Sequence, residues 1–184
     1  MKIPYFDFML ALMFLILFWW LFLLCWISVK ISSTGPGIFR QQRVGRYGNP
    51  FWCYKFRTMR VGTPEAGTHE IAANSITPIG RFFRKTRLDE LPQIFNILSR
   101  EMNFVGPRPC LTVQHDLINA RKQRGVDQLM PGITGLAQIE GIDMQDPVRL
   151  AKKDAEYLNN RSFLLDIRII FRTLFKTHGE FHRK

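Results

Sequence analysis

The clearest pattern along the chain is an uninterrupted apolar run near its start. Residues 8–29 form a stretch of 22 residues without a charged side chain. As a helix this run would be about 33 Å long, enough to cross the hydrocarbon layer of a membrane. A signal peptide has a shorter apolar core, of about 7–15 residues, that ends at a small-residue cleavage site. No such site follows the run, so residues 1–30 are predicted to be a permanent membrane-anchoring helix.

Residues 31–184 have mixed polarity and are expected to form one compact domain, the catalytic domain on the cytoplasmic side. Residues 38–43 and 51–57 alternate in polarity around a GRYGNP turn, which is typical of a β-hairpin. The segment 60–78 is rich in small and turn-forming residues and is predicted to be a surface loop. Helical spacing of apolar residues recurs in four later stretches, near 88–98 and over 112–124, 148–160 and 163–176. The expected fold class is α+β, mainly helical, with a small β-hairpin.

Charge separates the two parts of the chain. The formal net charge is +11, and residues 1–30 carry only Lys2, Asp7 and Lys30, so residues 31–184 have a net charge of +10. Such a basic body favours anionic partners, namely nucleic acid, anionic lipid or phosphorylated metabolites. Basic residues lie just after the apolar run and only Lys2 precedes it, which by the positive-inside rule puts the body in the cytoplasm.

The candidate chemistry is concentrated in the segment RFFRKTRLDELPQIFN. Pro92 is tolerated only in the first turn of a helix, so a helix is expected to begin near Leu88. Asp89 and Glu90 would then lie at a helix N-terminus, which favours negative charge and can also bind a phosphate. Basic side chains precede this pair at Arg81, Arg84, Lys85 and Arg87. By itself the segment favours the simpler interpretation, a helix cap beside a solvated basic face, because caps are far more common than nucleophiles.

Two further segments favour a site that handles phosphates. Arg108 lies between two prolines, which stiffen the backbone around a guanidinium suited to bidentate binding of phosphate oxygens. The segment PGITG is predicted to be a tight turn that presents backbone N–H groups to an anion. Together with the acidic pair and the anchor, these segments indicate a phosphate site at a lipid surface.

The sequence resembles the bacterial sugar transferases known as monotopic phosphoglycosyl transferases. The matching motifs follow one another along nearly the whole chain: FDFMLAL, GPGIFRQQRVG, YKFRTM, TPIGRFFRKTRLDELPQIFNIL, MNFVGPRP, PGITGLAQI and YLNNRSFLLDIRIIF. The length is that expected of the small members, a catalytic core with one membrane segment. The resemblance implies transfer of a sugar-1-phosphate from a UDP-sugar to polyprenyl (undecaprenyl) phosphate with release of UMP, as the first membrane step of a bacterial surface glycan.

The resemblance also implies roles for individual residues. Asp89 corresponds to the nucleophile that forms a covalent phosphosugar intermediate, and Glu90 to its partner in the Asp-Glu dyad. These two carboxylates would hold the Mg²⁺ that the family requires, with assistance in proton handling as the alternative role for Glu90. The implied phosphate-binding residues are Lys55, Arg57, Arg84, Arg87 and Arg108. The implied location is the bacterial inner membrane, in contact with its lipid, with downstream glycosyltransferases as possible partners.

The sequence departs from the family pattern at two places. The family's anchor breaks at a Ser-Pro pair and re-enters the membrane, whereas Trp19 and Trp20 occupy those positions here. Re-entrance is therefore implied by resemblance only, and a straight span is the alternative. The loop after PGITG also differs, with Leu136 and the triplet Glu140, Gly141 and Ile142 at family positions, which leaves the donor sugar open.

Two other classes of function compete with the enzyme. A membrane-tethered nucleic-acid binder would use the basic body, but no recognition-helix or RNA-binding signature is present, so nucleic acid is not an expected partner. A non-catalytic scaffold for glycan assembly would not need Asp89, Glu90 and Arg108 together. The last helical stretch, residues 163–176, is expected to pack its apolar face on the core, with contact to anionic lipid as the alternative.

Overall fold

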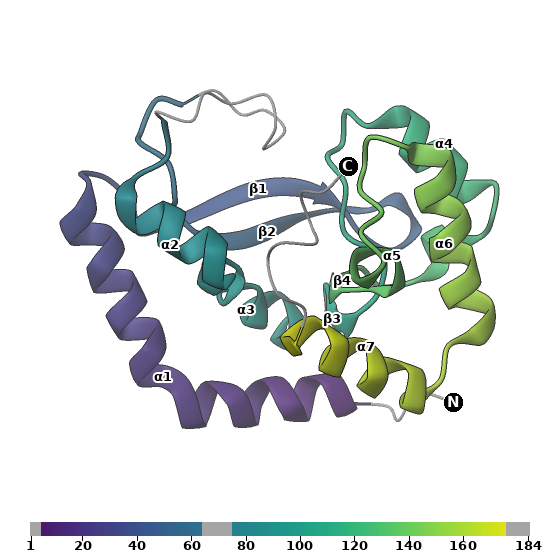
Figure 1. Cartoon of the computed structure of the whole chain (residues 1–184), viewed down its shortest axis with the longest axis horizontal. Helices are drawn as coiled ribbons and strands as arrows, with labels where there is room; N and C mark the ends of the chain where they lie inside the picture. Colours follow the sequence, from purple (N-terminus) through teal and green to yellow (C-terminus); the bar gives the residue numbers. More distant parts are fainter. Residues whose placement is uncertain (1–4, 64–74, 176–184) are drawn as a thin grey trace.

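The computed structural model describes residues 5–63 and 75–175 (Figure 1). A long bent helix, α1 (Phe6–Ser32), runs along the bottom and one side of the body in Figure 1. The β1–β2 hairpin crosses the centre, with α2 and α3 next to it, and α4 and α6 lie at the opposite end from the bend of α1. The described chain is mainly helical with two small sheets, as the α+β prediction requires.

The predicted hairpin is confirmed. Strands β1 (Ile38–Val44) and β2 (Pro50–Phe56) are antiparallel, with Ile38 opposite Phe56 and Val44 opposite Pro50. A short 3-10 turn, η1 (Arg46–Gly48), connects them. Alternate side chains of β2 are buried in the core, whereas Lys55 is only half-buried and available to the site.

The acidic pair precedes a helix, but not in the way the sequence suggested. Helix α2 (Pro78–Thr86) is capped by the Thr77 hydroxyl, which accepts the Gly80 N–H, and it ends where Arg87 adopts a left-handed conformation with φ 59°. Asp89 and Glu90 then lie in a single 3-10 turn, η3 (Leu88–Glu90), and α3 begins only at Gln93 (Gln93–Leu98). The expected helix from Leu88 thus begins as a 3-10 turn rather than as part of α3, because Pro92 has no N–H to donate to the Leu88 carbonyl four residues earlier. A six-residue helix also provides little dipole, so neighbouring cations must supply the positive field.

A second correction concerns PGITG. Its central residues form strand β4 (Gly132–Thr134), which pairs in parallel with β3 (Asn103–Val105). The Gly132 N–H donates to the Pro107 carbonyl, so it is not presented to an anion. Gly132 lies so close to the Gly106 backbone that a Cβ there would collide with it. The segment therefore supports the neighbouring Pro-Arg-Pro loop (residues 106–110) from behind.

The predicted later helices are confirmed, and α4 and α6 form the end of the body opposite the bend of α1. They are α4 (His115–Lys122), the short α5 (Leu136–Ile139), α6 (Pro147–Asn160) and α7 (Phe163–Phe175); a further turn, η4 (Val126–Gln128), follows α4. Arg121 of α4 and Asp154 of α6, both buried, form an ion pair in which Arg121 Nε donates to Asp154 Oδ2 at 2.9 Å. The segments 64–74 and 176–184, which include most of the predicted loop and the end of the last predicted helix, lie outside the described residues.

Helix α1 is broken in the middle, although Trp19 and Trp20 gave no reason to expect it. Phe18 departs from helical geometry, with φ −118° and ψ 19°, and Figure 1 shows a sharp bend in α1. The Trp20 indole N–H donates to the Leu17 carbonyl at 3.1 Å, next to the break. Tryptophan therefore provides a local hydrogen bond at the position where the family has a Ser-Pro pair. By length and composition α1 is the one described helix that could cross a membrane.

Both ends of α1 are fastened to the same body. Near the start, Asp7 Oδ1 accepts the backbone N–H of Phe104, and the Phe6 ring packs edge-on against Phe163 with centroids 5.0 Å apart. Just beyond the other end, Arg57 Nη2 donates to the Ser33 carbonyl at 2.8 Å. The bend thus allows one body to hold both arms of the helix.

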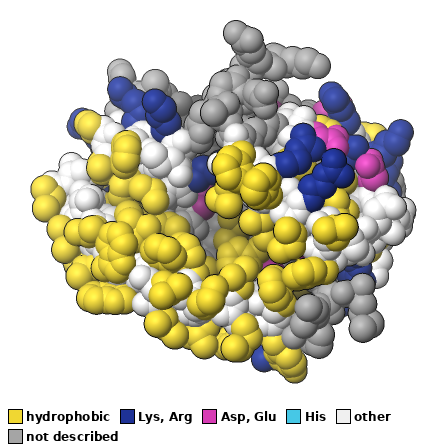
Figure 2. Space-filling model, turned by 60° about the horizontal axis from the view of Figure 1, so that its bottom comes forward, with side chains coloured by type: hydrophobic (Ala, Val, Ile, Leu, Met, Phe, Trp, Pro, Cys, Tyr) yellow, Lys and Arg dark blue, Asp and Glu magenta, His cyan; other side chains and the backbone are white. Residues whose placement is uncertain are grey.

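The last helix does not pack as expected. Asp166 and Ile169 face the core, whereas six large apolar side chains of α7 are exposed: Phe163, Leu164, Ile167, Phe171, Leu174 and Phe175. Figure 2, in which the side of α1 and α7 comes forward, shows a broad face of hydrophobic side chains with Lys and Arg at its upper edge. Phe82 of α2 and Phe95 of α3 are exposed as well. A contiguous apolar face of this kind marks an interaction surface, so the lipid-contact alternative for this helix is favoured over core packing.

Candidate active site

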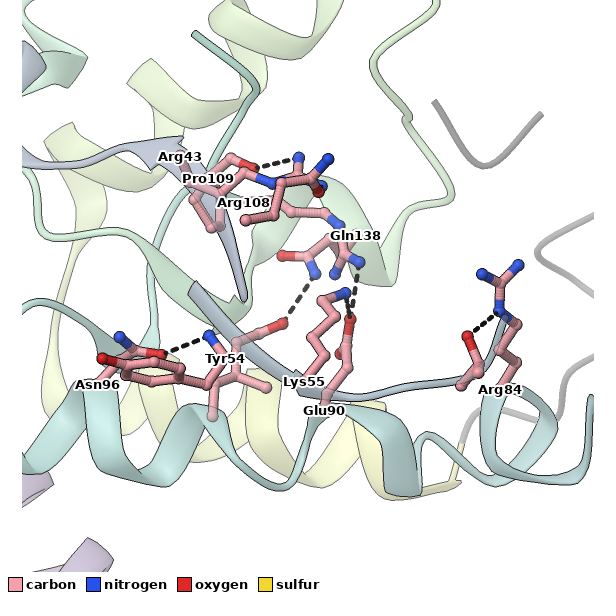
Figure 3. Close-up of polar contacts among 12 residues, drawn as sticks. Arg43, Tyr54, Lys55, Arg84, Glu90, Asn96, Arg108, Pro109 and Gln138 are labelled. Atoms are coloured by element: carbon pink, nitrogen blue, oxygen red, sulfur yellow. Dashed lines mark hydrogen bonds and ion pairs between the residues drawn. The ribbon is translucent and has the colours of Figure 1, made fainter. Parts of the chain in front are cut away.

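One oxygen of Glu90 is the focus of the candidate site. Oε1 accepts a hydrogen bond from Lys55 Nζ at 3.0 Å and another from Arg108 Nη2 at 2.7 Å. Figure 3 shows the two cations converging on Glu90, Lys55 from β2 and Arg108 from the Pro-Arg-Pro loop. Glu90 is buried, so these charge-assisted bonds are only weakly screened by solvent. Three residues far apart in sequence thus form one charged cluster beside Asp89.

The two adjacent carboxylates have opposite pKa shifts. Burial raises the pKa of Asp89, and the negative charge of Glu90 raises it further. Burial alone would also raise the pKa of Glu90, but Arg108 and Lys55 outweigh it and hold that pKa well below its usual range. Glu90 in turn raises the pKa of Arg108. Glu90 is therefore a permanent anion bound to two cations, and Asp89 is the carboxylate that is easier to protonate.

Of the other predicted phosphate-binding residues, Arg84 and Arg87 lie close enough to the acidic pair to interact with it, whereas Arg57 does not join the cluster. Arg84 Nε donates to the Thr58 hydroxyl at 3.0 Å, and its charge acts to lower the pKa of Asp89 (Figure 3). Burial lowers the pKa of Arg87, and Glu90 acts on it in the opposite direction. Arg57 is not brought to this cluster, because its guanidinium is buried against Ser33 at the end of α1.

The backbone that carries Arg108 is held at three successive carbonyl groups. Arg121 Nη1 donates to the Arg108 carbonyl at 2.9 Å, and Arg43 Nη1 donates to the Pro109 carbonyl at 3.3 Å. The Val44 N–H donates to the Cys110 carbonyl at 2.9 Å. The two prolines also restrict φ in this loop. The Arg108 guanidinium is therefore presented to Glu90 from a fixed backbone.

Sequence reasoning missed the residues that position this cluster. Asn96, fully buried in α3, accepts the Tyr54 N–H and donates to the Trp52 carbonyl, which fixes α3 and η3 against β2 (Figure 3). Arg43 and Arg121 support the Pro-Arg-Pro loop from β1 and α4. The only sequence signal for Asn96 is a polar side chain inside an apolar helical stretch. Nothing near Arg43 or Arg121 in sequence indicates a partner more than ten residues away.

A divalent cation fits the acidic pair only if substrate supplies further ligands. Across the described ranges no group of three or more His, Cys, Asp or Glu side chains is placed to bind a metal ion. Oε1 of Glu90 is already bonded to two cations, which leaves its other oxygen and the Asp89 carboxylate. Mg²⁺ in phosphate-handling sites is commonly bound by one or two carboxylates, with phosphate oxygens and water completing the octahedron. The residues present fit that arrangement.

Comparison with known proteins identifies the family. The family model for bacterial sugar transferases matches residues 2–180. The chain belongs to this family. It is 42% identical to a UDP-glucose:undecaprenyl-phosphate glucose-1-phosphate transferase of Xanthomonas campestris pv. campestris, over 95% of the chain and 38% of that protein. It is 37% identical to an undecaprenyl-phosphate galactose phosphotransferase of Salmonella typhimurium, over 91% of the chain and 39% of that protein.

A third relative is closer in size. An uncharacterized sugar transferase of Bacillus subtilis is 38% identical over 85% of the chain and 81% of its own length. The chain thus spans little more than a third of the length of the Xanthomonas and Salmonella relatives. The range matched by the family model, residues 2–180, includes Asp89, Glu90 and Arg108.

Proposed function

We propose that this member of the family transfers a sugar-1-phosphate from a UDP-sugar to polyprenyl phosphate. In the first step a carboxylate oxygen of Asp89 attacks the sugar-bearing phosphorus, and the bond from that phosphorus to the UMP oxygen breaks. UMP leaves, and the phosphosugar remains on Asp89 as an acyl phosphate. In the second step a phosphate oxygen of the polyprenyl carrier attacks the same phosphorus, and the Asp89 carboxylate leaves. The product is a polyprenyl diphosphosugar, and one enzyme group serves both substrates in turn.

The arrangement of Lys55 and Arg108 on Glu90, next to Asp89, is the observation that carries this proposal. An attacking carboxylate and a diphosphate repel each other, so cations must offset their charge in the transition state. Lys55 and Arg108 are already positioned by Glu90, and they can bind phosphate oxygens from the same places without reorganising. Glu90 remains ionised and keeps the two cations from moving away between turnovers. Arg84 adds a further positive charge that acts on Asp89.

The proposed cofactor is Mg²⁺, held by Asp89 and the second oxygen of Glu90. When bound, it would neutralise charge on the diphosphate and on the departing UMP. Asp89 and Glu90 would orient it toward the site where Arg108 and Lys55 bind the phosphates.

For the membrane segment we propose a re-entrant anchor, with both ends on the cytoplasmic side of the bacterial inner membrane. Three observations support it: the break at Phe18, the attachment of both ends of α1 to one body, and the exposed apolar face shared with α7. A straight span would separate Asp7 from Phe104 by the thickness of a bilayer. The basic body would then lie against anionic headgroups, next to the lipid-borne acceptor.

The proposed place in metabolism follows from the product. A sugar linked to a polyprenyl diphosphate must be extended by glycosyltransferases that act on lipid-linked acceptors, so this would be the first membrane step of a surface glycan. The relatives act on different donors, UDP-glucose for one and galactose for another by their names. The donor of this protein is therefore best determined by a panel of UDP-sugars.

The direct test is UMP release from detergent-solubilised or nanodisc-embedded protein with Mg²⁺ and polyprenyl phosphate. We expect multiple turnovers with at least one UDP-sugar, and we expect Asp89→Asn to lose activity by a factor of about 10³ or more, because it lacks the nucleophile. A radiolabelled sugar phosphate should remain bound to wild-type protein in the absence of acceptor. Full activity in Asp89→Asn would refute the proposed nucleophile, and lack of turnover with every UDP-sugar would favour a non-catalytic scaffold.

A further inference from the structure

A cavity lies next to the Pro-Arg-Pro loop, outside the Glu90 cluster. Its volume is about 180 Å³. Its apolar walls come from β1, the Pro-Arg-Pro loop, α4 and the segment after η4, and they include Val44, Pro107, Pro109, Ile118, Leu129 and Pro131. Two of the residues that line it, Tyr47 and Lys122, are exposed. No residue given a catalytic role above, apart from the loop itself, lines this cavity.

The cavity and the catalytic cluster share the Pro-Arg-Pro loop as a common wall. Pro109 lines the large cavity and also a small one formed with Lys55 and Arg108 at the cluster. Arg121, which lines the large cavity, donates to the backbone carbonyl of Arg108, whose guanidinium binds Glu90. The backbone of Arg108 therefore lies beside the large cavity, whereas its side chain lines the small cavity at the cluster. Since Pro109 lines both spaces, we take the large cavity as the apolar space adjacent to phosphates bound at Arg108.

We propose that this cavity binds the uracil base of the UDP-sugar donor and of the UMP product. The inference rests on the proposed function for the identity of the nucleotide. An apolar cavity of about 150 Å³ is large enough to bind benzene in a protein core, so 180 Å³ accommodates a pyrimidine ring. Proline rings and aliphatic side chains line much of it and are suited to contact the faces of a heteroaromatic base, as in most small-molecule sites.

The edge of the base also has suitable partners. Uracil presents one imide N–H between two carbonyl oxygens. The cavity is lined by one carboxylate, Asp127, which can accept from an N–H, and by Lys122, which can donate to a carbonyl oxygen. A few polar groups among apolar walls give orientation and selectivity for one base.

Other parts of the two substrates fit this cavity less well. The sugar carries several hydroxyl groups, and burying them against proline and leucine would leave them without hydrogen-bond partners. The polyprenyl chain would have to enter from the membrane side. The residues that line the cavity include none from α1, α2 or α7, and Figure 1 places α4 away from the bend of α1. The soluble donor is the substrate that can reach it.

The first experiment fills the cavity. Ile118→Trp adds bulk from α4 into the space, and Val148→Trp, an exposed position on α6, is the matched control. UMP binding to the full chain is measured by saturation-transfer NMR and titration, without lipid acceptor. We expect Ile118→Trp to weaken UMP binding at least tenfold and to raise KM for the UDP-sugar by a similar factor, with KM for polyprenyl phosphate unchanged. Unchanged UMP affinity in folded Ile118→Trp, judged by its melting temperature, would overturn the proposal.

A second measurement needs no variant, which covers the case in which Ile118→Trp does not fold. Wild-type protein is irradiated with 4-thiouridine monophosphate, and the crosslinked peptides are mapped by mass spectrometry. Crosslinks within residues 44–48 or 107–131 are expected, and crosslinks confined to other segments would contradict the cavity. The two proposals can fail separately. If UMP binds in this cavity but no UDP-sugar is turned over, only the proposed transferase activity is refuted. Turnover with UMP bound elsewhere would refute only the base site.

Discussion

At the scale of single residues, the site depends on unequal charges within one acidic pair. Glu90 is buried between Lys55 and Arg108, and its pKa is held low by them. Asp89, the next residue, has a raised pKa because it is buried next to that anion. Two carboxylates whose environments separate their pKa values are typical of acid, base and nucleophile assignments in enzymes. The geometry thus distinguishes a fixed anion from a candidate nucleophile.

A pH profile tests this distinction. Asp89 attacks only when ionised, so the rate of the first step should fall as pH drops through its raised pKa, above the ordinary value of about 3.9. Glu90→Gln removes the charge that raises this pKa and leaves two cations that lower it. We therefore expect the acid limb of UMP release, measured without acceptor, to move to lower pH by roughly one unit. Glu140→Gln, an exposed carboxylate, should leave the limb in place; an upward shift in Glu90→Gln would contradict the assignment.

At the scale of elements, contacts between distant segments hold the catalytic backbone. The Pro-Arg-Pro loop is supported by β4 behind it, by Arg43 from β1 and by Arg121 from α4. Arg121 is in turn paired with Asp154 of α6. The backbone that carries Arg108 is therefore held by α4 and α6, two helices that carry none of the proposed catalytic residues.

Removal of Asp154 should be costly because it leaves the Arg121 charge buried and unpaired. We expect Asp154→Ala to reduce the free energy of unfolding by about 3–5 kcal/mol, as measured by urea denaturation. Asp116→Ala, on the exposed first turn of α4, should cost no more than about 1 kcal/mol. Similar losses of unfolding free energy in the two variants would show that the buried Arg121–Asp154 pair stabilises the fold no more than an exposed carboxylate does.

The break in α1 gives a second prediction at this scale. Trp20→Phe removes the indole N–H that bonds the Leu17 carbonyl, and a lost hydrogen bond of about 1 kcal/mol changes a population ratio roughly fivefold. Spin labels on Met9→Cys and Leu24→Cys, both exposed, report the distance between the two arms. We expect a broader distribution that extends to longer distances in Trp20→Phe and little change in Trp19→Phe. Equal distance distributions in Trp20→Phe and Trp19→Phe would show that the bend is maintained by packing and not by the indole hydrogen bond.

At the scale of the whole molecule, the bent helix and α7 turn one face of the protein into an apolar platform (Figure 2). The catalytic cluster belongs to the same body that holds both ends of the anchor. This arrangement would bring the proposed nucleotide-sugar donor and the proposed lipid-borne acceptor to the Asp89 carboxylate. Depth and orientation in the bilayer are therefore part of the proposed mechanism.

Topology is tested by cysteine labelling in intact cells. Lys2→Cys should resist a membrane-impermeant maleimide and react only after permeabilisation, as Val148→Cys on the body should. The native Cys25, Cys53 and Cys110 are buried and give a low background. Labelling of Lys2→Cys from outside, with Val148→Cys protected, would establish a straight span and refute re-entrance.

The sequence by itself determined the elements whose signals are local. The apolar run, the alternation of the hairpin and the spacing of residues in α4, α6 and α7 come from side-chain periodicity, and the structure confirms them. The sequence also indicated Asp89, Glu90 and Arg108 as candidates, through their motifs. It could not show that Lys55 joins Glu90 while Arg57 turns toward Ser33.

Only the tertiary structure decided which charges meet. The left-handed Arg87, the parallel pairing of β3 with β4 and the break at Phe18 each depend on the surrounding packing rather than on local propensity. The contacts of Arg43, Asn96 and Arg121 join segments tens of residues apart or cross between elements, and periodicity carries no information about such pairs. A buried ion needs its partner within a few ångströms, and chain folding alone sets that distance.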